Sequence, residues 1–352
     1  MSKITGNALS HQPSLPDIRI NNRRYLGNKY RLLPFIRETV NAHCENVNIF
    51  ADLFAGTGAV SSAFQNECAI ITNDILYSNY IANFAWLGAE DYNEASVREL
   101  LSEFNAVEVT EDNYMSENFA DTYFSADDCR RIGYIRQRIE DEFAGGSINF
   151  REKSLLLTSL LYAMDRIAQT CGHYDAYRKG ASFTSRLELC FPKASHDNNP
   201  DNRCYNEDIN QLAPRVEADV VYLDPPYNSR QYCDTYHLPE NVARWEKPEI
   251  FGVARKMDRS TLKSAYCTKK ASDAFADLVN NLNARYILLS YNNMAKKGDD
   301  RSNARISDED IINILSAKGT VEIFSQPYRA FTAGKSDFTD NRERLFLCTC
   351  NL

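Results

Sequence analysis

A carboxylate, two prolines and an aromatic ring follow one another at the end of an apolar run. The run is ADVVYL, residues 218–223, and it leads directly into Asp224, Pro225, Pro226 and Tyr227. Prolines end strands and supply no backbone N–H, so this turn offers acceptors and few donors. Asp224 and the Pro225 carbonyl could accept both hydrogens of an exocyclic amine on a nucleobase while its ring stacks on Tyr227. The alternative is an ordinary strand-ending turn.

A second candidate site is the glycine turn DLFAGTG, residues 52–58, which separates an apolar run from a helical pattern. Gly56 and Gly58 permit positive φ and a close approach of a ligand to the backbone. Asp74 ends the next apolar run, 18 residues after Gly56, where an acid can accept hydrogen bonds from ribose hydroxyls. The third glycine of a dinucleotide fingerprint is absent. Together, the turn and the acid predict a nucleoside pocket.

The glycine turn, Asp74 and Asp224 can form one site only if the strands that precede them end at the same edge of a sheet. The apolar runs at 47–54 and 68–74 alternate with helical patterns, which is typical of a doubly wound parallel sheet. Ligands bind at the carboxyl ends of such strands, so Asp74 and Asp224 are expected at one pocket. Strand–helix alternation returns later in the chain and closes with two consecutive strands. One of those two is predicted to run antiparallel.

The alternation is interrupted between residues 90 and 194. This segment has charged helical patterns and then an irregular polar stretch, CGHYDAYRKGASFTSR. We therefore predict a catalytic domain built from 21–89 and 195–352, with 90–194 inserted into it. Residues 1–20, polar and interrupted by prolines, are expected to form a loose N-terminal arm.

Composition narrows the class of protein. The 352 residues carry a net charge of −8, yet 244–270 holds eight basic residues against three acidic ones, which leaves room for a nucleic-acid partner. The alternative for such a cluster is a solvated charged face. Ten cysteines form no zinc-type spacing, so no metal is expected. No apolar segment has the length of a signal peptide or membrane span, which predicts a reduced, cytoplasmic protein.

Three motifs, taken in order, resemble the D12-class, Dam-like DNA adenine-N6 methyltransferases. They are RRYLGNK at 23–29, FAGTG at 54–58 and DPPY at 224–227. The first is the more specific, since DPPY also occurs in other amino-methyltransferases. The resemblance implies an α/β, Rossmann-like methyltransferase fold with a mostly parallel seven-stranded sheet, one antiparallel strand and an inserted, mainly helical target-recognition domain. It also implies S-adenosylmethionine as the cofactor.

The resemblance implies that the matching positions of this chain contact the cofactor. The leading block and the glycine turn are expected around the methionine moiety, and Asp74 at the ribose. In YNEDINQ the acid expected at the cofactor adenine is Asp208, followed by Ile209, although this chain lacks the Gly-Asp-Phe of other members. A solvated acid is the alternative for Asp208. The implied cofactor-binding residues are Tyr25, Gly27, Asn28, Lys29, Asp52, Phe54, Ala55, Gly56, Thr57, Gly58, Asp74, Asp208 and Ile209.

The implied reaction is site-specific methyl transfer to adenine N6 in duplex DNA, with the target base turned out of the stack. Asp224, Pro225, Pro226 and Tyr227 are the expected catalytic residues, and Asp224 would also stabilise positive charge developing on nitrogen. We expect a monomeric methylase of a restriction–modification system, with a companion restriction endonuclease that it need not touch.

The insertion is the expected reader of DNA sequence, because its irregular stretch mixes basic and hydroxyl side chains. An exposed loop without a ligand is the alternative. The expected DNA-binding residues are Lys29, Arg178, Lys179, Arg186, Arg230 and Tyr232.

Two other functions compete with DNA methylation. Ribosomal-RNA guanine-N2 methyltransferases share the DLFAGTG turn and the DPPY strand, but they need neither the leading block nor a long insertion. A non-catalytic protein of the same fold could bind nucleic acid, but it would have no need of the acceptor geometry at Asp224.

Overall fold

The computed structural model describes residues 15–23, 25–292, 305–327 and 342–351. Within these residues, seven strands form one sheet in the order β5-β3-β2-β6-β7-β9-β8. Strand β9 runs antiparallel to β7 and β8, and the other neighbours are parallel. The predicted seven-stranded sheet with one antiparallel strand is therefore confirmed. The sheet strands are β2 (Ile49–Asp52), β3 (Ala69–Asn73), β5 (Arg203–Tyr205), β6 (Glu217–Leu223), β7 (Asn283–Asn292), β8 (Gly319–Pro327) and β9 (Arg342–Cys350).

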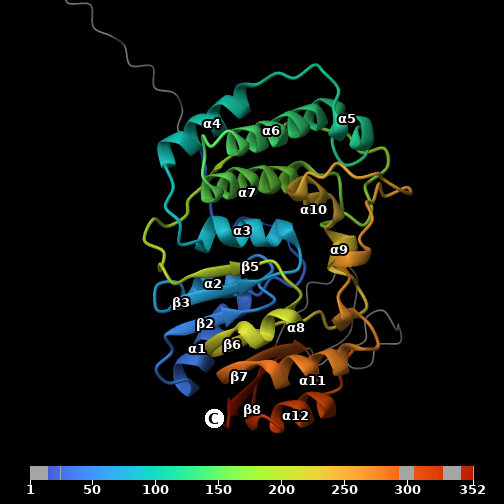
Figure 1. Ribbon diagram of the computed structural model, residues 1–352. Coiled ribbons are helices and arrows are strands. Elements are labelled where there is room, and N and C mark those ends of the chain that lie inside the picture. Colours follow the sequence, from blue (N-terminus) through green and yellow to red (C-terminus); the bar gives the residue numbers. More distant parts are fainter. Residues whose placement is uncertain (1–14, 24, 293–304, 328–341, 352) are drawn as a thin grey trace, which may run out of the picture.

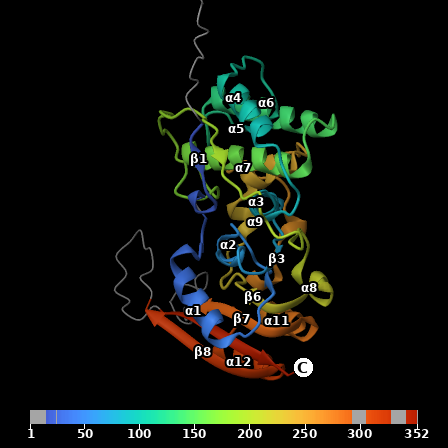
Figure 2. The same cartoon turned by 90° about the vertical axis from the view of Figure 1, so that its left-hand side faces the viewer.

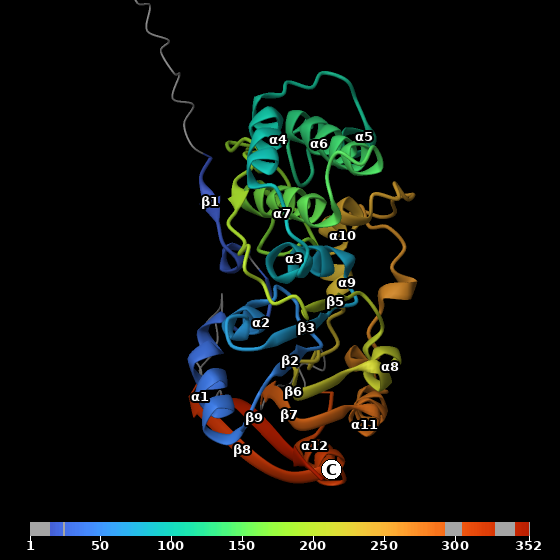
Figure 3. The ribbon, with the colours of Figure 1, turned by 60° about the vertical axis from the view of Figure 1, so that its left-hand side comes forward.

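Helices cover both faces of this sheet, because its central strands are apolar on both sides. Along β6, Val220 points into one apolar cluster and Val221 into the other. In Figure 3 the strands lie between α1 and α2 on one side and α8 and α11 on the other. The helices of these two layers are α1 (Leu33–His43), α2 (Ala59–Phe64), α3 (Tyr77–Leu87), α8 (Ile209–Leu212), α11 (Ala271–Asn281) and α12 (Asp308–Ser316).

A stack of further helices rises from the edge of the sheet that carries β5 and β3. Figures 1 and 2 show α7 next to α3, with α4 and α6 beyond it, at the end of the molecule opposite β8. The apolar residues of α7 join the same cluster that covers the sheet face, so the described residues show no separate core for this stack. Its helices are α4 (Glu94–Ala106), α5 (Tyr114–Phe119), α6 (Ala126–Ala144), α7 (Phe150–Ile167), α9 (Tyr232–Thr235) and α10 (His237–Arg244).

The segment predicted as an arm is partly built into the fold. Strand β1 (Asp17–Ile18) pairs in parallel with β4 (Phe191–Pro192), and Ile18 is buried. The prediction of a loose arm is therefore wrong for residues 15–20, because the apolar Ile18 finds a partner in the chain following α7. Residues 1–14 lie outside the described part of the chain. Among the described helices, none is both long and apolar enough to cross a membrane.

A buried carboxylate joins α10 to the start of α3. Glu240 is fully buried, and its Oε1 and Oε2 accept hydrogen bonds from the backbone N–H groups of Tyr77 (2.9 Å) and Ser78 (2.8 Å). Arg244 Nε donates to the same carboxylate at 2.7 Å. The first N–H groups of a helix have no partner inside the helix, so Glu240 supplies one and places a negative charge at the positive end of α3.

Replacing Glu240 with alanine is expected to lower the free energy of unfolding by about 2–4 kcal/mol, because two buried N–H groups and Arg244 lose their acceptor. Urea unfolding followed by circular dichroism measures this loss. Glu99→Ala, at an exposed position of α4, is the matched control. A change in Glu240→Ala no larger than in the control would contradict this account.

Candidate functional site

One pocket lies where β2, β3 and β6 end. Asp52 is the last residue of β2, and Asp74 and Asp224 directly follow β3 and β6. The stretch Thr261–Tyr266 forms another part of the wall. Of the residues expected from sequence, the pocket wall contains Tyr25, Gly27, Asn28, Lys29, Asp52, Phe54, Ala55, Gly56, Thr57, Asp74, Asp208, Ile209, Asp224, Pro226 and Tyr232.

The glycine turn is shaped by its contact with α3. Gly56 and Gly58 have φ values of +52° and +76°. A Cβ on Gly58 would lie 2.2 Å from Oδ1 of Asn83, so a larger residue would have to displace Asn83 and adopt a strained φ. The turn is also tied to the second predicted element, since the Gly56 N–H donates to Asp74 Oδ2 at 2.8 Å. The expected pairing of turn and acid is thus a direct hydrogen bond.

Three carboxylates of the pocket wall are buried or largely buried, and burial makes each harder to ionise. It raises the pKa of Asp52 to about 7 and that of Asp74 to about 6. It also raises the pKa of Asp224. Ser61 Oγ donates to Asp52 Oδ2 at 3.0 Å, whereas Asp52 Oδ1 is buried without a hydrogen-bond partner. The cluster therefore fits a ligand that brings positive charge or hydrogen-bond donors.

A buried cation partners Asp224. Lys29 Nζ lies 2.6 Å from Asp224 Oδ2 and donates a hydrogen bond to the Gly27 carbonyl at 3.2 Å. Burial lowers the pKa of Lys29, but attraction to Asp224 and Glu343 outweighs it and leaves that pKa above its ordinary value. The Lys29 charge in turn offsets part of the rise in the pKa of Asp224. The leading sequence block thus supplies a charge that favours the ionised form of the strand-end acid.

Aromatic rings line the pocket near the leading block. Tyr25 stacks on Tyr236 at 4.4 Å between ring centroids, with Tyr232 5.6 Å from Tyr25. The Tyr236 hydroxyl accepts from the Leu26 N–H at 2.7 Å, and Asn79 Nδ2 donates to the Tyr25 hydroxyl at 2.9 Å. Sequence reasoning placed Tyr232 at the DNA and missed Tyr236. Their spacing of one helical turn, just after DPPY, was the available signal.

Asp208 and Ile209 form the far end of the pocket. The Asp208 side chain accepts from the N–H groups of Asn210 and Gln211 and so caps the short α8, while Ile209 is buried beneath it. Phe54 meets Tyr266 edge to face at 5.0 Å. Tyr266, which sequence reasoning did not include, lies in the wall together with Asp208. This end combines the apolar Ile209 and the ring of Tyr266 with the acidic Glu207 and Asp208.

Several expected residues lie outside the pocket wall. The ring of Tyr227 packs edge to face against Tyr291, with 6.3 Å between ring centroids, and Tyr227 is not part of the pocket wall. Arg186 is paired with Glu108 at 2.6 Å. Gly58 lies against Asn83 of α3 and belongs to the glycine turn without lining the pocket. The expected site residues outside the wall are Gly58, Arg178, Lys179, Arg186, Pro225, Tyr227 and Arg230.

Asp52→Asn is expected to raise the free energy of unfolding at pH 8 by about 2–4 kcal/mol and to change it little near pH 4. The pKa of Asp52 in the folded state, about 7, lies above its ordinary value of 3.8, so the stability contributed by its protonated form is lost as pH rises through 7. Asparagine has no charge to bury. Urea unfolding at several pH values tests this, and parallel pH dependence in the two proteins would contradict it.

Comparison with known proteins identifies the chain's family. Residues 25–301 match the family described as D12 class N6 adenine-specific DNA methyltransferase. The chain is 35% identical to modification methylase StsI of Streptococcus sanguinis, with 88% of this chain and 48% of that protein covered. It is 31% identical to type II methyltransferase M.FokI of Planomicrobium okeanokoites, with 92% and 52% covered.

A third relative is closer to this chain in length. It is type II methyltransferase M.NlaIII of Neisseria lactamica, 29% identical, with 90% of this chain and 94% of that protein covered. The chain spans about half the length of the StsI and M.FokI methylases. The resemblance expected from the three motifs is confirmed: this chain belongs to the D12 class N6 adenine-specific DNA methyltransferase family.

Proposed function

We propose that this chain transfers a methyl group from S-adenosylmethionine to adenine N6 at a specific sequence in duplex DNA. One observation carries the proposal. Asp224, an acid followed by two prolines, opens into the same pocket as the glycine turn and Asp74. This reaction needs an acceptor for the base amine and a pocket for a nucleoside cofactor, and one cavity contains candidates for both.

The residues present fit the cofactor. Its sulfonium and ammonium groups are cationic, which suits a pocket with three buried or largely buried carboxylates. Asp52 Oδ1, buried without a partner, is a suitable acceptor for the ammonium group. Asp74 is the proposed acceptor for the ribose hydroxyls, and Ile209 and Tyr266 are the proposed apolar contacts of the adenine ring. When bound, the cofactor supplies an electrophilic methyl group.

The chain's own residues prepare the amine. Lone-pair delocalisation into the ring makes adenine N6 a weak nucleophile. Lys29 occupies Asp224 Oδ2, and the carboxylate retains a second oxygen to accept one amino hydrogen. The Pro225 carbonyl is proposed to accept the other, which directs the nitrogen lone pair toward the methyl group. Ionised Asp224 also stabilises the positive charge that develops on nitrogen.

The base must leave the duplex to reach Asp224, since its amine is inaccessible inside the stack. Tyr227 remains the proposed stacking partner, and in this structure its ring contacts Tyr291 edge to face. The exposed Arg178, Lys179 and Arg230 are proposed to contact DNA phosphates. Arg186 would first have to release Glu108, while Lys29 and Tyr232 would meet the DNA at the pocket itself.

The relatives' names support a modification methylase of a restriction–modification system. We therefore also propose a cytoplasmic monomer whose target sequence is shared with a companion restriction endonuclease. An RNA guanine methyltransferase and a non-catalytic binding module are less favoured, because the family match includes residues 25–29 of the leading block as well as DPPY.

Expression in a host without DNA methylation, followed by base-resolved sequencing, tests the proposed function. We expect modified adenine at one short DNA sequence and none in a host carrying the empty vector. Methyl transfer to RNA alone would replace DNA as the substrate. No transfer to either would favour a binding module.

Asp224→Ala is expected to lower the rate of methyl transfer by at least about 100-fold, because the amine loses its charged acceptor. Binding of S-adenosylhomocysteine, measured by calorimetry, should change far less, since the cofactor contacts lie elsewhere in the pocket. Asp273→Ala, at an exposed position of α11, is the control. Normal turnover in Asp224→Ala would refute the role of this acid.

Lys29→Met is expected to move the acidic limb of the kcat/KM profile to higher pH by about one unit or more, whereas Lys29→Arg should move it less. Burial raises the pKa of Asp224 and the Lys29 charge offsets this, so removing the charge makes Asp224 harder to ionise. Glu343, Asp52 and Tyr222 also interact electrostatically with Asp224 and remain unchanged in both variants. Identical limbs in wild type and Lys29→Met would show that the ion pair does not set this pKa.

A further inference from the structure

One part of the pocket wall is a single stretch of chain that is tied down at both ends. We call residues 261–266 the wall stretch. Gln231 Nε2 donates to the Ser264 carbonyl at 3.0 Å, and the Ser264 N–H donates to Gln231 Oε1 at 2.8 Å. The Tyr266 hydroxyl donates to Asn210 Oδ1 at 2.9 Å. These bonds fix the position of the residues in the wall stretch.

The wall stretch carries an exposed cation. Lys263 lines the pocket and is exposed to solvent, so it lies at the pocket mouth. Among the described residues, the pocket wall has two basic side chains, Lys29 and Lys263. Lys29 is buried and paired with Asp224, whereas no acid of the described chain forms an ion pair with Lys263. Lys263 is therefore the wall cation that is available to an anionic ligand.

This cation lies on the side of the pocket that contains Asp224. Gln231, which holds the wall stretch, is followed directly by Tyr232 of the wall. The Tyr232 hydroxyl donates to a backbone carbonyl of the leading block at 3.4 Å. Lys29 of that block pairs with Asp224. The hydrogen bonds thus connect the wall stretch to the strand-end acid through neighbouring segments.

The charges around Lys263 leave this side of the mouth positive. Burial raises the pKa of the Cys233 thiol to about 11, and Asp234 adds to the rise while Arg259 and Lys263 oppose it. These three charges therefore lie near Cys233. Asp234 and Arg259 form an ion pair of 2.6 Å and offset each other, which leaves the charge of Lys263. The exposed Asp258 lies outside the pocket wall.

A phosphate of the DNA backbone is the anion that suits this position. A nucleotide that turns out of the duplex brings its own phosphates to the pocket mouth. The acids of the wall would repel them, and a lysine at the mouth offsets that repulsion. These acids are Asp52, Asp74, Glu207, Asp208 and Asp224.

The carboxylate of the cofactor fits Lys263 less well. It is bonded to the same carbon as the ammonium group, and the proposed acceptor of that group is the buried Asp52. Lys263, by contrast, is exposed. A ligand that approaches from solvent therefore matches this lysine better than one that lies deep in the pocket.

We propose that Lys263 binds a phosphate of the target nucleotide at the pocket mouth and so holds the extruded adenine beside Asp224. This inference rests on the proposed function and deepens it, because it assigns a DNA contact to the wall of the pocket itself. The contact neutralises one phosphate and reads no base, so it contributes affinity and position but no sequence preference.

Binding of a duplex that carries the mapped recognition sequence tests this contact. In the presence of S-adenosylhomocysteine, Lys263→Gln is expected to raise the Kd for the duplex about 10-fold and to reduce the slope of log Kd against log salt concentration by about one. Lys263→Arg keeps the charge and should retain most of the affinity. Binding of S-adenosylhomocysteine alone should stay within about twofold of wild type.

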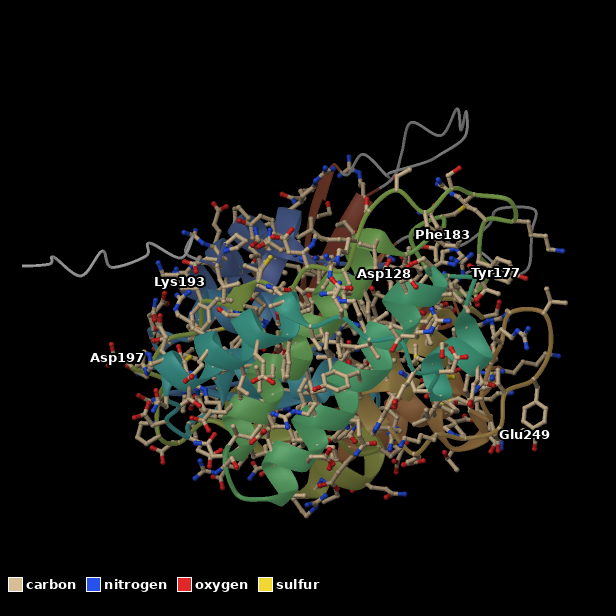
Figure 4. All side chains as sticks on the ribbon, turned by 90° about the horizontal axis from the view of Figure 1, so that it is seen from above. Asp128, Tyr177, Phe183, Lys193, Asp197 and Glu249 are labelled. Atoms are coloured by element: carbon tan, nitrogen blue, oxygen red, sulfur yellow. The ribbon has the colours of Figure 1, made fainter. Side chains whose placement is uncertain are left out.

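A matched control removes the same charge elsewhere. Lys193→Gln changes an exposed lysine outside the pocket wall and should leave the Kd for the duplex unchanged. Figure 4 shows Lys193 on the opposite side of the molecule from Glu249, which lies in the chain that leads from α10 to the wall stretch.

A neutral phosphate identifies the partner of Lys263. Methylphosphonate replaces a charged phosphate oxygen with a methyl group, and it is placed in turn on the 5′ and the 3′ side of the target adenine. At one of these positions, wild type should bind as weakly as Lys263→Gln binds the unmodified duplex. Lys263→Gln should lose no more than about twofold further there, as expected when both changes remove one interaction.

Equal losses for wild type and Lys263→Gln at both positions would overturn the phosphate contact and leave the methyltransferase assignment intact. An unchanged Kd for the duplex in Lys263→Gln would do the same. Weaker binding of S-adenosylhomocysteine by Lys263→Gln would also overturn it and assign the lysine to the cofactor. Wild-type protein that methylates no duplex would instead overturn the proposed function.

Discussion

The ion pair between Lys29 and Asp224 is the interaction on which the rest of the site depends. It joins two residues 195 positions apart and holds the leading block against the end of β6. A carboxylate buried among Asp52 and Asp74 without this cation would be protonated more readily and would be a weaker acceptor. By folding back onto Asp224, Lys29 therefore favours the ionised form of this acid in the pocket.

Contacts with the helical stack also hold the leading block in place. Glu240 fixes α10 to the start of α3, directly after Asp74, and Tyr236 of the adjacent turn stacks on Tyr25 of the leading block. Arg23, also buried, donates to Asp165 of α7 and to Asn79 of α3. These contacts connect the insertion, the segment after DPPY and the leading block into one apolar cluster. The proposed recognition and methyl-transfer regions thus share a support, so their relative position is set by packing.

Much of this arrangement could be predicted from local patterns. Apolar runs leading to Asp74 and Asp224 indicated parallel strands, and the rule that such strands present their carboxyl ends together placed both acids at one pocket. Side-chain partners could not be predicted in the same way. Neither the contact between Tyr227 and Tyr291 nor the ion pair between Arg186 and Glu108 could be read from the sequence. Such partners come from segments that are distant in the sequence, and their pairing produces no periodic pattern of residues.

The sequence by itself determined the sheet, its glycine turn and the identity of the strand-end acid, because strand ends, proline and glycine act through local backbone geometry. Only the tertiary structure decided that Lys29 pairs with Asp224, that Asp52 keeps an unpartnered oxygen, and that Tyr25 lies in a stack with Tyr236. It also decided that Lys263 is exposed at the mouth of the pocket that contains Asp224. Burial and charge pairing arise when distant parts of the chain meet, so their effect on ionisation and exposure has no local signature.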